Sequence, residues 1–286
     1  MASNEKNKKR RVGIIGFGKL GQYLINAVQE SDQQDLAFVW CRREEVLRGH
    51  VTEELILKDL SKESLSERNP DLIVDVTHKS IAEVHGADFL SVADYMIGCP
   101  TALADEKIDK ELRDAAHQNG LYVPTGAFWG GNDIQKMADR NTLKALKVTM
   151  TKHPDSLKLV DGELKERNAQ VKEGESEVLY DGPVRGLCDK APNNVNTMAT
   201  AAIAAHNLGF DKVQGCLVSD TRMKNWHIVE VEVTGPTDSK TGNVFHVSTK
   251  RKNPAEIGAV TGKATYASFV SSMMGAKGLG AGVHLC

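Results

Sequence analysis

The first half of the chain alternates short apolar runs with amphipathic segments. The apolar runs cover residues 12–15, Leu36–Trp40, Asp71–Thr77, Tyr95–Gly98 and Leu121–Thr125. Apolar residues at helical spacing follow the first run, and the same spacing predicts helices over Ser80–Val92 and Asp105–Gln118. Short apolar runs separated by amphipathic helices are typical of parallel strands buried on both faces. This half is therefore predicted to be a doubly wound α/β domain.

The pattern changes near Gly126, where strand-like runs begin to follow one another directly. These runs cover Leu143–Met150, Val178–Tyr180, Val213–Val218, His227–Val233 and Val244–Thr249. Successive strands without intervening helices favour antiparallel pairing. Helices are predicted only at Asn196–Asn207 and at about Gly262–Met274. We therefore expect a second, mixed α/β domain with an open, largely antiparallel sheet.

The segment Arg11–Gly21 places an apolar strand directly before a Gly-x-Gly-x-x-Gly turn and a helix. Gly16 permits a tight turn, Gly18 leaves no side chain between the backbone and a phosphate, and Gly21 lets the helix pack closely on the strand. The helix N-terminus then faces the anion. This order of strand, turn and helix predicts a dinucleotide site. Its cradle comprises Gly16, Phe17, Gly18, Lys19, Leu20 and Gly21.

These patterns divide the chain into four predicted parts. We expect a flexible tail over residues 1–10, a dinucleotide-binding Rossmann domain over 11–127, a second α/β domain that holds the substrate over 128–252, and a C-terminal helix and tail over 253–286. The basic residues near the N-terminus have no apolar core behind them, so they do not indicate a signal peptide. Whether the last helix returns to the first domain is left open by the sequence.

Composition narrows the class of partner. Hydrophobic residues make up 41% of the chain, charged residues 26%, and the net charge is −2. This balance is typical of a globular protein, gives no basic field for nucleic acid, and includes no apolar run near the roughly 20 residues that span a bilayer. Five scattered cysteines without a CxxC pair favour small buried side chains and a cytosolic location. No histidine spacing indicates a metal site, so none is expected.

The residues after the second predicted strand bear on the choice of cofactor. An NAD site carries an acidic residue there, about 20 positions beyond the glycines. This chain has Arg42 and Arg43 instead, and their planar forks of donors suit a 2′-phosphate. The alternative is that both arginines are surface residues and that Glu44 or Glu45 holds the ribose. We predict use of both NADP and NAD, with a preference for NADP.

Histidine is the obvious proton carrier near neutral pH, and the chain has nine. His78 follows a strand of the first domain, at an edge where nucleotide folds bind ligands, so it is a candidate for the cofactor site. His227 begins a strand in the half expected to hold the substrate, which makes it a candidate catalytic residue. A structural role in the core is the more common alternative for a single histidine at such a position.

Three further segments could contribute to a site. Gly126–Gly131 has small residues that permit close approach of a cofactor, although a hinge would have the same composition. Pro192–Thr197 carries three asparagines that could cap a helix or bind a carboxamide. Lys152–Pro154 ends a predicted strand and could offer a cation to a carboxylate, the alternative being a surface turn.

Four motifs taken together resemble the L-aspartate dehydrogenase family, and most closely its animal branch. They are GFGKLG at Gly16–Gly21, GAFWGG at Gly126–Gly131, NVN at Asn194–Asn196 and NWH at Asn225–His227. Gly182–Cys188 and Asn253–Gly262 resemble the animal branch in particular. The resemblance covers nearly the whole chain. Trp226 and the arginines after the second strand differ from the small residues of the microbial enzymes.

The resemblance implies a role for several residues. His227 takes the position of the family's catalytic histidine, and Ala127 and Asn196 take positions that bind the nicotinamide nucleotide. The implied reaction oxidises L-aspartate with NAD(P)+ to an imine, which water converts to oxaloacetate and ammonia, or runs in reverse as an amination. The implied assembly is a homodimer formed through the second domain.

The substrate's two carboxylates require donors, for which Lys152, Arg185 and Lys224 are candidates together with helix N-termini. Two other interpretations stay open. One is a different enzyme of the same architecture, similar to dihydrodipicolinate reductase or homoserine dehydrogenase. The other is a non-catalytic protein that binds or senses NADP(H).

Overall fold

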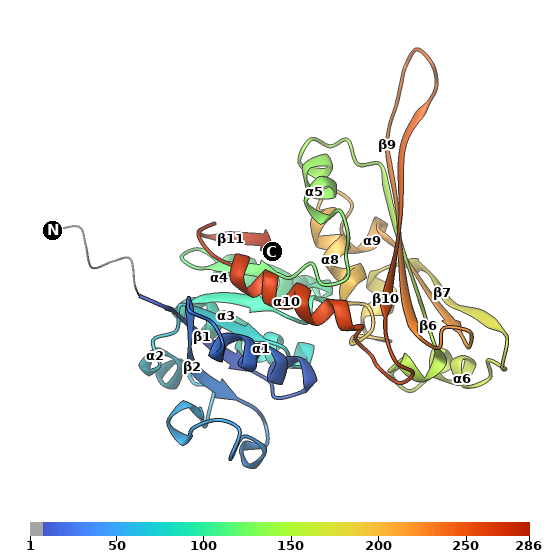
Figure 1. The fold of residues 1–286 in the computed structure, drawn as a ribbon. Coiled ribbons are helices and arrows are strands. Elements are labelled where there is room, and N and C mark those ends of the chain that lie inside the picture. Colours follow the sequence, from blue (N-terminus) through green and yellow to red (C-terminus); the bar gives the residue numbers. More distant parts are fainter. Residues whose placement is uncertain (1–7) are drawn as a thin grey trace. The chain divides into compact units, whose positions relative to one another are not determined.

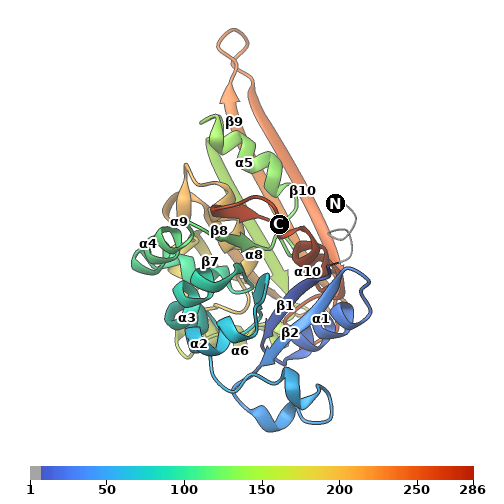
Figure 2. The same cartoon turned by 90° about the vertical axis from the view of Figure 1, so that its left-hand side faces the viewer.

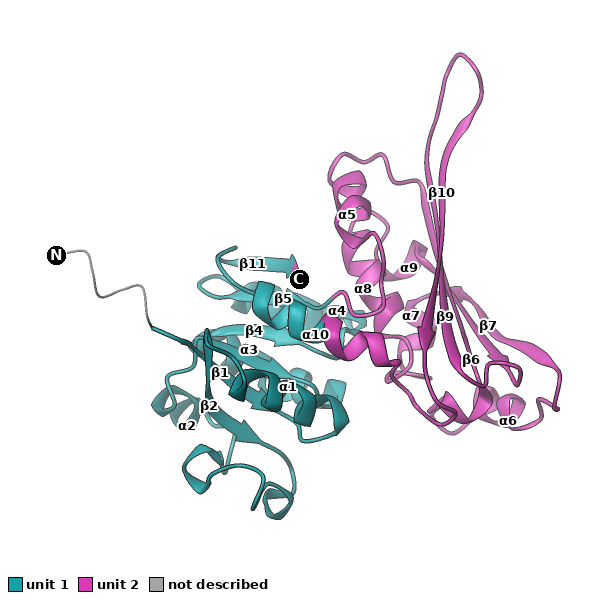
Figure 3. Ribbon diagram, viewed as in Figure 1, with its two compact units in different colours: residues 1–124, 269–284, 286 teal, residues 125–268, 285 magenta. Residues whose placement is uncertain are grey.

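The computed structural model describes residues 8–286 and divides the chain into two compact units (Figure 3). The first unit contains the chain up to Pro124 together with residues 269–284 and Cys286, and the second contains residues 125–268 with Leu285. Most of the predicted N-terminal tail, residues 1–7, lies outside the described residues, and Arg10 already belongs to a strand.

The first unit is built on a six-stranded sheet with the order β11-β5-β4-β3-β1-β2. Its strands are β1 (Arg10–Ile15), β2 (Gln34–Trp40), β3 (Leu72–Asp75), β4 (Asp94–Ile97), β5 (Gly120–Val123) and β11 (Gly282–Leu285). Every pair among β1 to β5 is parallel. The order runs outward from β1 in both directions, so the predicted doubly wound sheet is confirmed.

Helices cover both faces of this sheet (Figures 1 and 2). On one face, α1 (Lys19–Gln29) and α10 (Lys263–Gly275) share a core with Leu72 and Val74 of β3. On the other face, α3 (Lys79–Val92) and α4 (Glu106–Ala115) pack together, with α2 (Lys62–Glu67) beside α3. Strands buried on both sides explain the nearly continuous apolar runs of the sequence.

The C-terminal segment completes the first unit. Phe269, Met273 and Ala276 lie in its hydrophobic core. The sequence predicted a tail after the last helix, whereas the structure has the edge strand β11 there, whose neighbour Cys286 donates its N–H to the Val123 carbonyl at 3.0 Å. A strand of four residues that follows a glycine-rich segment is too short to show a hydrophobic period, which is why the pattern did not predict it.

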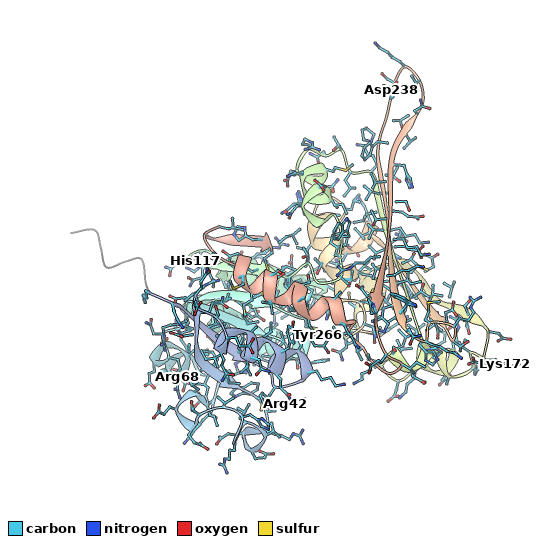
Figure 4. All side chains as sticks on the ribbon, in the orientation of Figure 1. Arg42, Arg68, His117, Lys172, Asp238 and Tyr266 are labelled. Atoms are coloured by element: carbon cyan, nitrogen blue, oxygen red, sulfur yellow. The ribbon has the colours of Figure 1, made fainter. Side chains whose placement is uncertain are left out.

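The second unit is built on a five-stranded sheet with the order β10-β9-β6-β8-β7. Its strands are β6 (Ala145–Lys152), β7 (Ser176–Pro183), β8 (Gln214–Asp220), β9 (Trp226–Thr237) and β10 (Val244–Pro254). Only the β6–β8 pair is parallel, which confirms the predicted open and largely antiparallel sheet. Strands β9 and β10 form a long hairpin with Asp238 at its tip (Figures 1 and 4).

The central helix of the second unit is α8 (Asn196–Ala204), which is buried from Thr197 to Ala204 and packs on α5 (Gly131–Asp139) and β6. A helix that is apolar all round belongs to the interior. The remaining helices are α6 (Glu163–Ala169), α7 (Arg185–Cys188) and α9 (Gly209–Lys212), with 3-10 turns elsewhere in the chain. Within residues 8–286, no helix is long and apolar enough to cross a bilayer.

Candidate functional site

The glycine turn after β1 has the geometry that a phosphate cradle requires. Gly16 has a φ of +112°, which favours glycine, and a Cβ on Gly21 would lie 2.0 Å from the Gly16 carbonyl oxygen. A Cβ on Gly18 would meet nothing within 4 Å, so the space beside this backbone is open. Gly18 is also the N-cap of α1, and no side chain caps the helix. The first N–H groups of α1 are therefore available to an anion.

The carboxyl end of β3 packs against this turn. A Cβ on Gly16 would lie 2.9 Å from the Thr77 methyl group. Asp75, which is 1% exposed, accepts hydrogen bonds from the Thr77 N–H at 2.9 Å and from the Tyr95 hydroxyl at 3.2 Å. Burial raises the pKa of Asp75 to about 6. The sequence showed Asp75 only as the polar end of a strand. His78 is exposed at the N-cap of α3, at the same end of β3.

The segment after β2 presents two arginines to solvent. Arg42 and Arg43 are exposed, and neither guanidinium has a hydrogen-bond or ion-pair partner within residues 8–286; Figure 4 labels Arg42. Glu44 forms an ion pair with Arg48 at 3.5 Å. Free guanidinium groups beside an engaged carboxylate favour the arginines over Glu44 as ligands of the ribose, and a 2′-phosphate would suit them.

In the second unit, His227 is buried with one ring nitrogen unused. It is 4% exposed and is the only buried histidine of the nine, all of which lie within the described residues. Nε2 has no hydrogen-bond partner, while the ring bonds to the backbone of Ala259. Burial and the nearby charge of Lys152 lower the pKa of His227 to about 4. The imidazole is therefore neutral at pH 7, with Nε2 able to accept a proton.

Lys152 lies beside His227 on the neighbouring strand. Thr151 pairs with Ile228 across β6 and β9, and one further antiparallel step places Lys152 opposite His227. Lys152 is 3% exposed, and its Nζ donates to the Val260 carbonyl at 3.0 Å. Burial lowers its pKa to about 8. No carboxylate within the described residues forms an ion pair with it, so this buried cation has only a neutral partner.

The two asparagines of the NVN motif differ in their hydrogen bonding. Asn194 is satisfied, because its Oδ1 accepts from the Lys158 N–H at 2.8 Å and its Nδ2 donates to the Ser156 carbonyl at 3.1 Å. Asn196, the first residue of α8, has a buried Oδ1 without a partner. An unpartnered acceptor fits the amide N–H of a nicotinamide carboxamide. Asn194 is therefore structural, and Asn196 is the residue of this motif that is available to a ligand.

The GAFWGG motif forms a tight turn before α5. Gly126 has a φ of +56° and Gly130 of +81°, and the Phe128 N–H donates to the Thr125 carbonyl at 2.8 Å. The Gly126 carbonyl accepts hydrogen bonds from Arg251 and Ser268, two residues that were not predicted from the sequence. No spacing marks these two residues, since they reach the turn only through the fold.

The other two candidate substrate residues are engaged elsewhere. Arg185 forms a bidentate ion pair with Asp211, at 2.6 and 2.8 Å. Arg185 comes two residues after Pro183, which pairs with the first residue of β8. Lys152 pairs with Ser219, near the last residue of β8, so Arg185 and Lys152 lie at opposite ends of this strand. Lys224 forms an ion pair with Glu173 at 3.0 Å. Of the three candidates, the structure brings only Lys152 to His227.

No group of three or more His, Cys, Asp or Glu side chains suited to a metal occurs in the described part of the chain. A pocket of about 620 Å³ opens in the second unit next to Lys152. It is lined in part by His153, Lys158, Lys165 and Asn168, and neither Lys152 nor His227 lines it.

Comparisons with known proteins show the family and support the fold. Residues 133–272 match the family described as "Aspartate dehydrogenase, C-terminal", and residues 16–124 match "Homoserine dehydrogenase, NAD binding domain". The chain is 51% identical to an aspartate dehydrogenase domain-containing protein of Xenopus tropicalis, over 98% of this chain and 99% of that protein.

More distant relatives carry an enzyme name. An L-aspartate dehydrogenase of Nitrosopumilus maritimus is 26% identical, over 77% of this chain and 82% of that protein. The crystal structure of an aspartate dehydrogenase from Thermotoga maritima has the same fold, with a TM-score of 0.66 and 18% identity over 95% of this chain and 98% of that one.

Proposed function

The chain belongs to the aspartate dehydrogenase family, a family of oxidoreductases, and on that premise we propose that it is an NAD(P)-dependent L-aspartate dehydrogenase. The proposed reaction oxidises the carbon that bears the amino group of L-aspartate and yields oxaloacetate and ammonia, or runs in reverse as a reductive amination. Relatives at 26% identity carry the name L-aspartate dehydrogenase.

The pair of His227 and Lys152 carries this proposal. A buried ammonium group without a counter-charge is costly, and buried charges are normally paired. Lys152 is bonded only to a backbone carbonyl, so a carboxylate of the substrate would supply the missing charge. His227 offers an unpaired nitrogen on the adjacent strand. An amino acid that carries carboxylates and an amino group matches this combination of a cation and a proton acceptor.

The residues present fit a nicotinamide dinucleotide. The open space beside Gly18 admits a pyrophosphate, Arg42 and Arg43 are free to bind a 2′-phosphate, and the unpartnered Oδ1 of Asn196 can accept a hydrogen bond from the carboxamide. When bound, the nicotinamide ring supplies the hydride chemistry. The protein's task is then to hold the substrate in line for hydride transfer and to manage the protons.

His227 manages those protons through Nε2. As the hydride leaves the α-carbon with its electron pair, the nitrogen lone pair forms the carbon–nitrogen double bond of iminoaspartate. His227 takes the proton lost from the amino group, or later the proton from the water that adds to the imine carbon. The other ring nitrogen forms the hydrogen bond to the backbone of Ala259, and this bond fixes the orientation of the ring. Addition of water and loss of ammonia then leave oxaloacetate.

The finer properties follow from the same residues. The two exposed arginines support use of both NADP and NAD, with a preference for NADP. A comparison of the Michaelis constants for the two cofactors measures this preference. Strict use of NAD would contradict this assignment. We assign the dimer contact to the second unit, as the family resemblance implies. The five cysteines form no disulfide, which supports a reducing compartment such as the cytosol.

The test is oxidation of NADPH in the presence of oxaloacetate and ammonium, and an aspartate dehydrogenase requires both. The His227→Gln variant should lose about 10²- to 10⁴-fold in kcat while it retains its affinity for NADPH. His206→Gln is a matched control, because His206 is exposed and paired with Asp139 at 2.8 Å. Turnover without ammonium would indicate another reductase of this architecture. Tight binding of NADPH without any turnover would indicate a sensor.

A further inference from the structure

The peptide bond between Gly126 and Ala127 is held from one side by two donors. The Gly126 carbonyl accepts from Arg251 Nη1 at 3.1 Å and from Ser268 Oγ at 2.9 Å. These donors lie 125 and 142 residues away in the sequence, so the contact depends on the fold of the second unit rather than on the turn itself. Two hydrogen bonds to one carbonyl fix the plane of its peptide group.

This orientation determines where the next N–H points. The peptide bonds of the described residues are all trans, and in a planar trans peptide the carbonyl and the following N–H point in opposite directions. The Ala127 N–H is therefore directed away from Arg251 and Ser268. No acceptor for it exists within residues 8–286, although Ala127 is only 9% exposed. Backbone N–H groups in such places are almost always paired, so this donor is available to a ligand.

Arg251 also holds the strand that neighbours His227. Its Nε donates to Asn253 Oδ1 at 2.9 Å. Asn253 is 2% exposed and pairs with His227 across β10 and β9. One guanidinium therefore ties the turn at Gly126 to the strand register at His227. An arginine can do this because its donors form a rigid fork, whereas a lysine offers a single ammonium group.

We propose that Arg251 and Ser268 are positioning residues that aim the Ala127 N–H at the carbonyl oxygen of a primary carboxamide. The carboxamide oxygen would accept from Ala127, and its amide N–H would donate to the unpartnered Oδ1 of Asn196. A donor and an acceptor of this kind complement an amide group. The inference rests on the proposed function in one respect, because it identifies this carboxamide with that of the nicotinamide.

The test compares the affinities for two ligands by titration calorimetry. NADPH carries the carboxamide, and 2′-phospho-ADP-ribose lacks the whole nicotinamide. Arg251→Met and Ser268→Ala should each weaken NADPH binding by about 3- to 10-fold, which corresponds to one misplaced hydrogen bond. Binding of 2′-phospho-ADP-ribose should stay at the wild-type value. Lys252→Gln is the matched control, since Lys252 is exposed and pairs with Ile228 on the opposite face of the hairpin.

The outcomes separate this inference from the proposed function. Equal weakening of both ligands would mean that the two residues support the fold in general, and would overturn the inference. Wild-type protein that binds NADPH no more tightly than 2′-phospho-ADP-ribose would overturn it as well. If the affinity ratio changes as expected but aspartate is not a substrate, the inference stands and the proposed reaction fails. Should Arg251→Met not fold, the ratio for Ser268→Ala decides the matter alone.

Discussion

His227 and Lys152 continue the inward-facing positions of their strands. In β6, Leu146, Val148 and Met150 are buried before Lys152, and in β9 the valines at alternate positions after His227 are buried in the same way. The pleat therefore delivers two polar side chains to the interior at the end of an apolar face. Burial disfavours the charged form of each side chain, which explains why the pKa values of His227 and Lys152 are both lowered.

The first prediction concerns Lys152. Lys152→Met keeps much of the buried volume and removes the cation. We expect the KM for oxaloacetate or L-aspartate to rise by about 10-fold or more, because a charge-assisted hydrogen bond contributes about 1.5–3 kcal/mol. The affinity for NADPH should be unchanged. Arg185→Met serves as the comparison, since Arg185 is paired with Asp211, and an equal rise in KM for that variant would refute the assignment of Lys152.

The second prediction concerns pH. The folded-state pKa of His227 is lowered from 6.5 to about 4, so between these values the unfolded chain binds the proton and the folded chain does not. Stability therefore falls as the pH drops through this window, by on the order of 2 kcal/mol for this group. His227→Asn should lack that component, so its loss of stability between pH 7 and pH 4.5 should be smaller than that of the wild type.

Urea unfolding at several pH values measures this difference. The wild-type profile alone is ambiguous, because the pKa of Asp75 is raised to about 6 and a raised carboxyl pKa favours the folded state as the pH falls. The wild type must therefore be compared with the His227→Asn variant. Parallel profiles for the two proteins would contradict a lowered pKa of His227.

At the scale of elements, the glycines of the turn between β1 and α1 have different roles, one in packing and one in access for a ligand. Gly21 is required by the fold, because a Cβ there would lie 2.0 Å from a carbonyl oxygen, whereas a Cβ on Gly18 would project into open space. The same residue type thus serves packing at one position and access at the other. Two substitutions to alanine can separate these roles.

The third prediction follows from this contrast. Gly21→Ala should destabilise the first unit by about 1–3 kcal/mol through overpacking and should weaken nucleotide binding as a result. Gly18→Ala has a compatible φ of −73° and should keep the wild-type thermal midpoint, yet its affinity for NADPH should fall at least 10-fold. Differential scanning calorimetry and titration calorimetry measure the two effects. A stable Gly18→Ala variant with unchanged affinity would contradict the cradle.

The elements that the sequence predicted are those whose pattern is complete within a short window. The glycine turn, the strands β1 to β10 and the helices α1, α3, α4, α8 and α10 have such patterns. Helices α6, α7 and α9 have seven, four and four residues, which is too short for a helical period to be recognised.

Site residues divide in the same way. His227 and Asn196 are candidates from motifs and the resemblance, and Lys152 is a candidate from its place at the end of a strand. Arg251, Ser268 and the buried Asp75 were not identified, because each acquires its meaning from partners far away in the sequence or from burial. Contacts of this kind become visible only when the strand register is known.

At the scale of the whole molecule, the first unit is discontinuous in sequence. Its hydrophobic core includes Phe269, Met273 and Ala276, and Arg10 donates to the Met273 carbonyl at 3.4 Å and also to the Ala276 carbonyl. The Tyr122 hydroxyl accepts from the Leu279 N–H at 3.3 Å. A fragment that ends at Pro124 therefore lacks a helix and an edge strand of its own sheet.

The fourth prediction tests this dependence. Deletion of residues 277–286 removes β11 and the bond between Cys286 and Val123. We expect the thermal midpoint of the first unit to fall by several degrees and the affinity for NADPH to fall with it, since a loss of about 1 kcal/mol lowers the midpoint of a domain of roughly 150 residues by about 2–4 °C. Cys286→Ser is the control, because it keeps the backbone bond. A deletion variant as stable as the wild type would show that β11 is dispensable.

The discontinuity also sets an order for folding during synthesis. Apart from Leu285, the residues of the second unit form one continuous stretch, 125–268, which is synthesised before Phe269. The first unit begins earlier, yet its apolar surface on β3 and β5 stays without Phe269 and Met273 until those two residues have been synthesised. Domains that are contiguous in sequence usually fold in N-terminal order during translation. In this chain the unit whose synthesis begins first still lacks part of its core when residues 125–268 are complete, so its sheet exposes apolar surface during that interval.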